Sequence, residues 1–375
     1  MKRSYFLFLT CLIFSTPLAH PVNAKNKPKY QSVRQIAFQR AKSLNNGINI
    51  SWLEQTWDQR VLDTVPVTKT DFVLLKKLGF KSIRLPVAFG YFAEHQVPIE
   101  KVCSHIDRLV KQCSLYGMKL IIVYHSGTLD DNNYTAETKK IADLWCFLAK
   151  RYQNISPDEL FFDIYNEPPH MDPQTWKDAA YNIVSAIRKI DSKRTLLVGA
   201  SNYNSIYELS RFVRLADENI IYSFHFYEPF FFTHQGAEWI GDQVATIGVP
   251  FPYDRGKNFP PLNPKAKNTA GESHYNEYPR DGNEQSIYDK LTIVKNWANK
   301  YDVPVICSEY GVYNKYADIT SRCNYIKAVR RQLYILNMPG LLWDYNTNFS
   351  IFTGKPSMEN LPDCMKDAIG YVQTN

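Results

Sequence analysis

The feature that most constrains the fold is a regular alternation of short apolar runs with amphipathic segments between about residues 47 and 371. Eight runs have the length and composition of buried strands, and a segment with helical spacing of apolar residues follows each run. The predicted strands are residues 47–51, 82–87, 119–125, 160–165, 195–201, 220–227, 304–312 and 340–346. The predicted helices are residues 69–78, 100–116, 136–152, 173–190, 204–212, 283–301, 321–336 and 359–371. Strands this apolar are typical of parallel sheets covered on both faces, so the pattern predicts an α/β fold, a single (β/α)8 TIM barrel.

A doubly wound open sheet is the competing topology. Such a sheet usually binds a nucleotide at the point where its strand order reverses. However, no G-x-G-x-x-G follows the first strand and no G-x-x-x-x-G-K-[ST] occurs in the chain. The spacing breaks once, after the sixth strand, where a loop insertion of about residues 228–283 is rich in aromatic residues and proline. Loops of this length in compact domains are usually functional, and we interpret the insertion as a stiff wall over the barrel mouth, not a second domain.

The N-terminus has the pattern of an export signal. Lys2 and Arg3 precede an apolar run over residues 5–14, and small residues up to Ala24 suit a signal peptidase. We therefore expect residues 1–24 to be a signal peptide and residues 25–375 to be the working domain, secreted or periplasmic. An uncleaved anchor is the alternative. Six cysteines follow Ala24, an even number that permits disulfides without requiring them.

Composition excludes several classes of function. The chain of 375 residues carries a net charge of +7, spread over 44 basic and 37 acidic residues, which is too dilute for a nucleic-acid surface. No Cys-x-x-Cys or His-rich pair occurs, so we expect no structural zinc site, and no cofactor is predicted. The many tyrosines, phenylalanines and tryptophans suit a surface on which sugar rings stack.

Polar residues gather where the predicted strands end. In a (β/α)8 barrel these carboxyl ends meet at one face, which carries the active site. The candidate site residues are Arg84, His125, Asn166, Glu167, His225, Tyr227, Glu309 and Trp343.

Glu167 and Glu309 are the most informative pair. Glu167 follows the fourth strand and Glu309 lies near the end of the seventh, so the barrel would place them on opposite sides of one cleft. Two facing carboxylates are what glycoside hydrolysis requires: carboxyl groups about 5 Å apart imply retention, and a gap of about 6.5–9.5 Å implies inversion. Arg84 is the natural cationic partner of one of them.

The motifs around these glutamates resemble those of glycoside hydrolase family 5, the cellulase family of clan A. Residues 164–168 read I-Y-N-E-P and residues 308–311 read S-E-Y-G, and the resemblance extends over about residues 47–365. It implies that Glu167 is the proton donor and Glu309 the nucleophile.

The resemblance also implies roles for the other candidates. Asn166 would bind the sugar 2-hydroxyl, Arg84 would support the nucleophile, and Trp343 would stack on the sugar at the cleavage site. His225 and Tyr227 would orient Glu309, and His125 would line the same subsite. The chain departs from the common pattern at His125-Ser126 and in the first strand, G-I-N-I-S-W, which leaves the roles of Trp52 and Trp57 open. For Trp239 and Phe230, sugar stacking and packing in the protein are equally weighted interpretations.

The sequence thus predicts a secreted, monomeric, metal-independent β-glycosidase that cleaves a β-1,4-glucan internally by double displacement. A β-mannanase, a β-1,3-glucanase and an exopolysaccharide hydrolase share the same glutamate pair and are the alternatives within the family. A non-catalytic carbohydrate-binding protein is the alternative from another class. The expected partner is a polysaccharide or oligosaccharide, with neither nucleic acid nor membrane.

Overall fold

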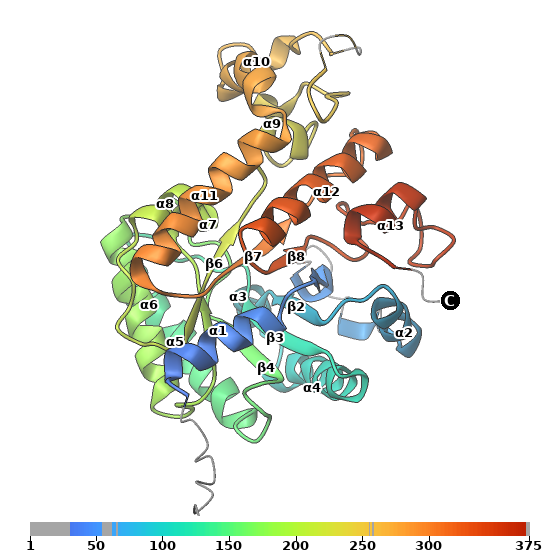
Figure 1. The fold of residues 1–375 in the computed structure, drawn as a ribbon. Coiled ribbons are helices and arrows are strands. Elements are labelled where there is room, and N and C mark those ends of the chain that lie inside the picture. The colour runs from blue at the N-terminus through green and yellow to red at the C-terminus, as the bar shows by residue number, and fades with distance from the viewer. Residues whose placement is uncertain (1–30, 55–61, 65–66, 255, 257–258, 373–375) are drawn as a thin grey trace, which may run out of the picture. The chain divides into compact units, whose positions relative to one another are not determined.

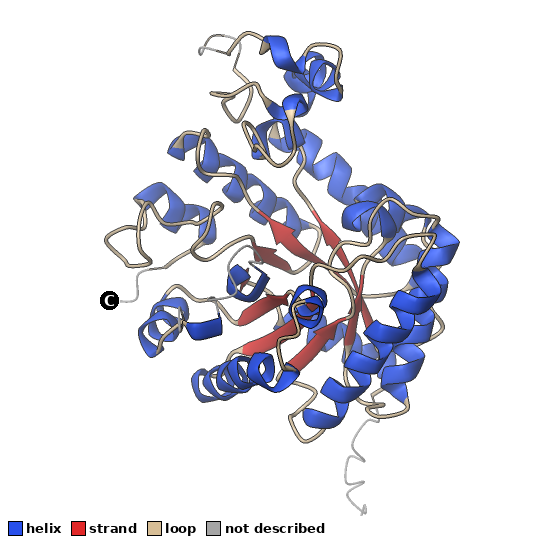
Figure 2. Ribbon diagram, turned by 180° about the vertical axis from the view of Figure 1, so that it is seen from behind, coloured by secondary structure: helices blue, strands red, loops and turns tan. Residues whose placement is uncertain are grey.

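The computed structural model describes residues 31–372 except 55–61, 65–66, 255 and 257–258. The predicted signal peptide and Trp57 lie outside the described residues. The described residues from Val33 onward form one compact unit, in which eight strands close into a barrel of parallel neighbours, β1 to β8 in chain order (Figures 1 and 2). The strands are β1 Gly47–Asn49, β2 Ser82–Val87, β3 Lys119–Tyr124, β4 Leu160–Asp163, β5 Leu196–Val198, β6 Ile220–His225, β7 Val305–Tyr310 and β8 Gly340–Leu342. The predicted (β/α)8 fold is confirmed.

Helices surround the barrel, as the view coloured by secondary structure makes plain (Figure 2). The longer ones are α1 Val33–Ser43, α2 Lys69–Lys77, α4 Ile99–Tyr116, α5 Tyr134–Arg151, α6 Pro173–Arg188, α10 Ala270–Asp281, α11 Glu284–Tyr301, α12 Ile319–Ile335 and α13 Asp363–Ile369. The short ones are α3 Phe89–Glu94, α7 Ser201–Asn204, α8 Ile206–Arg211, α9 Phe230–Thr233 and the 3-10 helices η1 Ser51–Glu54, η3 Asp242–Val244 and η4 Pro264–Ala266. Most predicted strands extend past the observed ones because ladder pairing stops where the chain turns toward the barrel mouth.

The strand interiors follow the two-residue alternation of a pleated sheet. In β3, Leu120 and Ile122 pack in the large core between the strands and the helices, whereas Ile121 and Val123 belong to a separate apolar cluster. That cluster, the apolar layer, fills the lower barrel and is closed by residues from α1 and its end. Its members are Ala41, Leu44, Ile121, Val123, Phe161, Leu197, Ile221, Ile306 and Leu341.

The insertion after β6 is more regular than the sequence predicts. It contains α9, η3, η4 and the twelve-residue helix α10, which begins after Thr269, whose hydroxyl accepts the Gly271 N–H at 3.0 Å. Much of its aromatic content packs on itself: Phe259 stacks with Tyr278 at a ring separation of 5.7 Å, and Tyr253 meets both rings edge-on. The insertion therefore contains helices that its sequence does not signal, and its interpretation as a wall over the barrel mouth stays a prediction.

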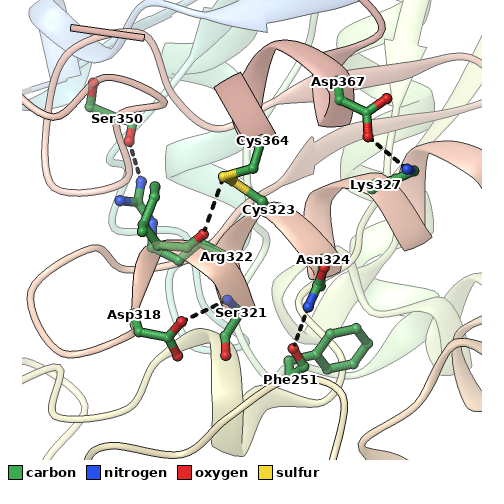
Figure 3. Close-up of a disulfide and its surroundings, with 11 residues drawn as sticks. Phe251, Asp318, Ser321, Arg322, Cys323, Asn324, Lys327, Ser350, Cys364 and Asp367 are labelled. Atoms are coloured by element: carbon green, nitrogen blue, oxygen red, sulfur yellow. Dashed lines mark hydrogen bonds and ion pairs between the residues drawn. A yellow bond between two sulfur atoms is a disulfide. The ribbon is translucent and has the colours of Figure 1, made fainter. Parts of the chain in front are cut away.

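A disulfide joins the last two long elements of the chain. Cys323 in α12 bonds to Cys364 in α13, and Lys327 pairs with Asp367 at 2.6 Å beside it (Figure 3). The segment between the two cysteines contains β8. The other cysteines among the described residues are free thiols. Among the described residues, no helix is long and apolar enough to cross a membrane.

Candidate active site

Arg84 is the centre of a polar layer that lies directly above the apolar layer. Its neighbours Ile83 and Leu85 pack outward in the core under the helices, so the alternation turns Arg84 into the barrel. The side chain is fully buried. Its guanidinium donates to Glu309 Oε1 at 2.6 Å, Asn166 Oδ1 at 2.8 Å, and both Asn49 Oδ1 and Asp163 Oδ2 at 3.0 Å. A charge this deep is stable only with such partners.

Glu309 is held at both of its oxygens. Arg84 donates to Oε1, and the Tyr227 hydroxyl donates to Oε2 at 2.9 Å. The residue lies in β7 opposite His225 of β6, at a point where the strand register shifts. This shift breaks the simple alternation and brings the carboxylate to the mouth of the barrel. Glu309 is therefore a buried carboxylate with a fixed orientation and one cationic partner.

Glu167 approaches the same point from β4, on the other side. Its Oε1 lies 2.6 Å from His225 Nδ1, while His225 Nε2 lies 3.4 Å from Glu309 Oε1. One ligand atom from each of these three residues lies within 4.8 Å of the other two. The resemblance implies that His225 orients Glu309, whereas in the structure its closer contact is with Glu167.

The protonation states of this group differ because the surroundings differ. Burial raises the pKa of Glu167 to about 7, against smaller lowering effects of His125 and Arg84. Burial lowers the pKa of His225 to about 3, so its imidazole is neutral. Near neutral pH, Glu167 can therefore hold a proton a short distance from a carboxylate that is paired with Arg84.

His125 forms a second ion pair at the other edge of the cleft. Its Nε2 lies 2.8 Å from Glu54 Oε2, and its ring is stacked on Trp343, with centroids 6.2 Å apart and an interplanar angle of 11°. Burial disfavours the charged imidazole, but Glu54 outweighs burial, and the pKa of His125 is raised. No motif or spacing in the sequence selects Glu54, which comes from the short helix η1.

These groups line one cavity of about 620 Å³ at the carboxyl ends of the strands. Its lining residues are Glu54, His125, Asn166, Glu167, Tyr227, His234, Trp239, Glu309, Trp343, Asn346, Thr347, Asn348 and Phe349. Six of the eight predicted site residues are therefore at the cavity surface, and Arg84 and His225 lie behind it. The sequence did not single out His234 or the residues after Trp343 that also line the cavity, because they lie in loops without a pattern.

Trp239 is the exposed residue of the insertion that lines the cavity, together with the buried His234. Its side chain is 56% exposed, and its ring meets Tyr313 edge-on at 4.9 Å and lies 6.5 Å from the ring of Phe349. Phe230, in contrast, is stacked on His234 at 4.1 Å. Trp52, at 5% exposed, is packed against His105. Of these aromatic residues, Trp239 presents the broad surface to the cleft.

Gly311, the last residue of the S-E-Y-G motif, lies where a side chain would not fit. A Cβ at Gly311 would lie 1.9 Å from the carbonyl oxygen of Trp343, so the backbone can pass Trp343 only without a side chain. The S-E-Y-G motif thus brings Glu309 and Trp343 close to each other.

Glu167, His225 and Glu309 are also the group of described residues whose geometry suits a metal ion. Arg84 already donates to Oε1 of Glu309, which gives that carboxylate its cation. A second cation there would face the guanidinium at close range, so the donor set suits proton chemistry better than metal binding.

A parallel eight-stranded barrel with two acidic side chains converging at its carboxyl end defines the class of (β/α)8 glycosidases. The family model "Cellulase (glycosyl hydrolase family 5)" matches residues 41–348. Endoglucanase 3 of Fibrobacter succinogenes is 31% identical over 85% of this chain, which spans about half (52%) of that protein. Endoglucanase C of Acetivibrio thermocellus is 30% identical over 83% of this chain and 94% of that protein. The chain belongs to glycosyl hydrolase family 5.

Solved structures agree with this assignment. A hyperthermophilic endo-β-1,4-glucanase in complex with substrate superposes with a TM-score of 0.71 at 25% identity, covering 89% of this chain and 99% of the other. Cellulose synthase subunit Z of Clostridioides difficile superposes with a TM-score of 0.69 at 26% identity, covering 86% and 98%.

Proposed function

We propose that the protein is an exported endo-β-1,4-glucanase that acts with retention, through a glycosyl-enzyme formed on Glu309. The observation that carries this proposal is the approach of Glu167 and Glu309, whose nearest ligand atoms lie within 4.8 Å. Retaining glycosidases hold their carboxyl groups about 5–5.5 Å apart, whereas inverting enzymes leave room for a water molecule. The endoglucanase names of the relatives support β-1,4-glucan as the substrate class.

Glu309 is the proposed nucleophile and Glu167 the proposed acid and base. Arg84 and Tyr227 fix the Glu309 carboxylate through both oxygens, so it can attack the anomeric carbon without reorienting. The raised pKa of Glu167 keeps a proton available for the leaving oxygen. Once the bond is broken, the same carboxylate, now ionised, takes the proton of the attacking water.

The remaining residues are proposed to bind the sugar. Asn166 lies between Arg84 and the cavity and would meet the 2-hydroxyl, and Trp343 offers a ring at the cleavage site. His125, held by Glu54, would donate to a hydroxyl beside it. Trp239, with its exposed ring, would stack on a more distant sugar unit. His225 is proposed to orient Glu167 and Glu309 from behind the cavity.

Export of residues 25–375 as one catalytic domain after removal of residues 1–24 is part of the proposal. The Cys323–Cys364 disulfide supports an oxidising destination outside the cytosol, where such bonds persist.

Chemical rescue tests the roles. Glu309→Gly should be inactive on 2,4-dinitrophenyl β-cellobioside, and azide should restore turnover with formation of the α-glycosyl azide, because a small anion replaces the missing carboxylate. Glu167→Gly should instead give the β-azide, since azide then attacks the glycosyl-enzyme. The absence of rescue in Glu309→Gly, or a β-product from it, would refute the nucleophile assignment.

A substrate panel separates the proposed activity from its alternatives. We expect cello-oligosaccharides and carboxymethyl cellulose to be cleaved internally, with mannan and β-1,3-glucan cleaved more slowly. A faster rate on mannan or β-1,3-glucan would move the assignment within the family. Binding without turnover of any substrate would leave a carbohydrate-binding protein.

A further inference from the structure

Asp163 is a buried acid that the mechanism above does not use. It is the last residue of β4, and its side chain is fully buried inside the barrel, two residues beyond Phe161 of the apolar layer. Its Oδ2 lies 3.0 Å from both Nε and Nη2 of Arg84. Its Oδ1 has no hydrogen-bond partner among the described residues. An acid placed this deep needs a reason, since burying an ion with few partners is unfavourable.

The first part of the reason is geometric. A guanidinium has five N–H donors in a rigid plane, and here it donates hydrogen bonds to four different side chains. Nε donates to Asp163, Nη2 donates to Asn166 and lies 3.0 Å from Asp163 Oδ2, and Nη1 donates to both Asn49 and Glu309. Because the plane is rigid, the edge that Asp163 holds determines where the opposite edge meets Glu309.

The second part is electrostatic. The charged groups that act on Asp163 are Arg84 of β2, Glu309 of β7 and His125, which follows β3. Burial raises the pKa of Asp163 to about 6, and Arg84 and His125 work against burial. Two carboxylates therefore share one guanidinium. When Asp163 is ionised, Arg84 neutralises Glu309 only in part, and Glu309 keeps more of its negative charge for attack on carbon.

We propose that Asp163 is a positioning residue that divides the charge of Arg84 and so sets the reactivity of Glu309. The inference rests on the proposed role of Glu309 as nucleophile. When Asp163 is protonated, the positive charge of Arg84 acts on Glu309 alone, and the Glu309 carboxylate becomes a weaker nucleophile. The acidic limb of the rate profile then includes the protonation of Asp163.

Asp163→Asn removes the charge with little change of shape. Since Oδ1 is unpartnered, the amide nitrogen can occupy that position while the remaining oxygen still accepts from Arg84. The test reaction is inactivation by 2,4-dinitrophenyl 2-deoxy-2-fluoro-β-cellobioside. In this step the Glu309 carboxylate bonds to the anomeric carbon and dinitrophenolate leaves, so no proton from Glu167 is required.

We expect inactivation of Asp163→Asn at pH 7 to be roughly 10- to 100-fold slower than in the wild type, a loss typical of a misplaced or weakened reacting group. Its acidic limb should lie about one pH unit lower than that of the wild type, because the Asp163 proton is no longer part of the profile. Asp344→Asn is the matched control. Asp344 is equally buried, its pKa is also raised to about 6 by burial, and it accepts from Ser51 and Thr347 without contacting Arg84. Its acidic limb should not move.

The proposal would be overturned if the acidic limb of the pH–rate profile stayed in place in folded Asp163→Asn. It would also be overturned if the limb of Asp344→Asn moved by the same amount. Failure of both Asp163→Asn and Asp163→Ser to fold would show that the role of Asp163 is structural. Thermal unfolding of both Asp163 variants shows whether they fold. Azide rescue of Glu309→Gly separates this question from the proposed function. If azide restores turnover but the acidic limb of Asp163→Asn does not move, only the inference about Asp163 fails. If azide does not restore turnover, the proposed function itself fails.

Discussion

The two layers inside the barrel are built from the same eight strands and have opposite chemistry. The lower one is purely apolar, with Ile121, Phe161 and Ile306 among its members. In the upper one, Asp163 follows Phe161 by two residues along β4 and pairs with Arg84 of β2. The lower layer gains stability from burial itself, whereas each upper side chain is tolerated only because a named partner satisfies it.

The comparison shows that residues serving stability and residues serving chemistry lie only two positions apart along the same strand. Substitutions in the lower layer should therefore affect unfolding and leave turnover alone, whereas substitutions in the upper layer and the cleft should affect turnover first, with a change of stability where a buried charge is removed. Each of the following experiments tests one side of that division.

The largest effect is expected from Glu167→Ala. Loss of the general acid should lower kcat/KM on cellotetraose by about 10²- to 10⁴-fold. The loss should be far smaller in the glycosylation of the enzyme by 2,4-dinitrophenyl β-cellobioside, whose leaving group needs no proton. The measurement is the pre-steady-state burst on both substrates, and an equal loss on both would contradict the role of Glu167 as acid.

In the apolar layer, Phe161→Ala should lower the free energy of unfolding by about 3–5 kcal/mol through lost burial and a cavity. Denaturant titration measures this change, with Val73→Ala on the exposed face of α2 as a nearly neutral control. The folded enzyme should keep its kcat at 25 °C. A stable variant with reduced kcat would show that the two layers are not separate.

A smaller effect is expected from Trp239→Ala. Loss of one stacking surface, about 0.5–1.5 kcal/mol, should raise KM on long cello-oligosaccharides roughly 2- to 10-fold with little change on cellobiosides. Tyr334→Ala, which removes an exposed ring of α12 that does not line the cavity, is the control. A uniform effect on short and long substrates would assign Trp239 to packing.

The smallest effect concerns stability and pH. The folded pKa of Glu167 is about 7 against an ordinary value of 4.5, so the folded protein holds this proton longer than the unfolded chain, and its stability decreases as pH rises through that range. Glu167→Gln should therefore raise Tm at pH 8 and have no such effect at pH 4.5.

Differential scanning calorimetry at both pH values checks the sign. Glu238→Gln should give no gain at pH 8, because Lys315 lowers the pKa of that exposed carboxyl. A gain in both variants would point to surface charge instead of the buried acid.

Much of the fold was predictable because each strand carries its own signal. Ser82–Val87 was predicted to the residue, since six buried residues are followed by a turn of the chain. The pairing of Glu167 with Glu309 followed from the symmetry of the barrel, which places strands four and seven opposite each other.

What the sequence did not reveal depends on side-chain neighbours. Asp163 is the polar residue of an otherwise apolar strand, and nothing local shows that its partner is Arg84, 79 positions away. Glu54 likewise meets His125 only through the fold. Helix α10 was missed because Pro279 and a polar composition conceal its period.

The disulfide between α12 and α13 has a practical consequence for anyone who produces this protein. It closes a loop with a sequence separation of 41, and such a closure contributes about 4 kcal/mol in the chain-entropy model. The closed loop contains Trp343, so the cross-link restrains the same segment that forms one wall of the cleft. Expression with oxidative folding, and purification without thiol reductants, should therefore be matched before rates from different preparations are compared.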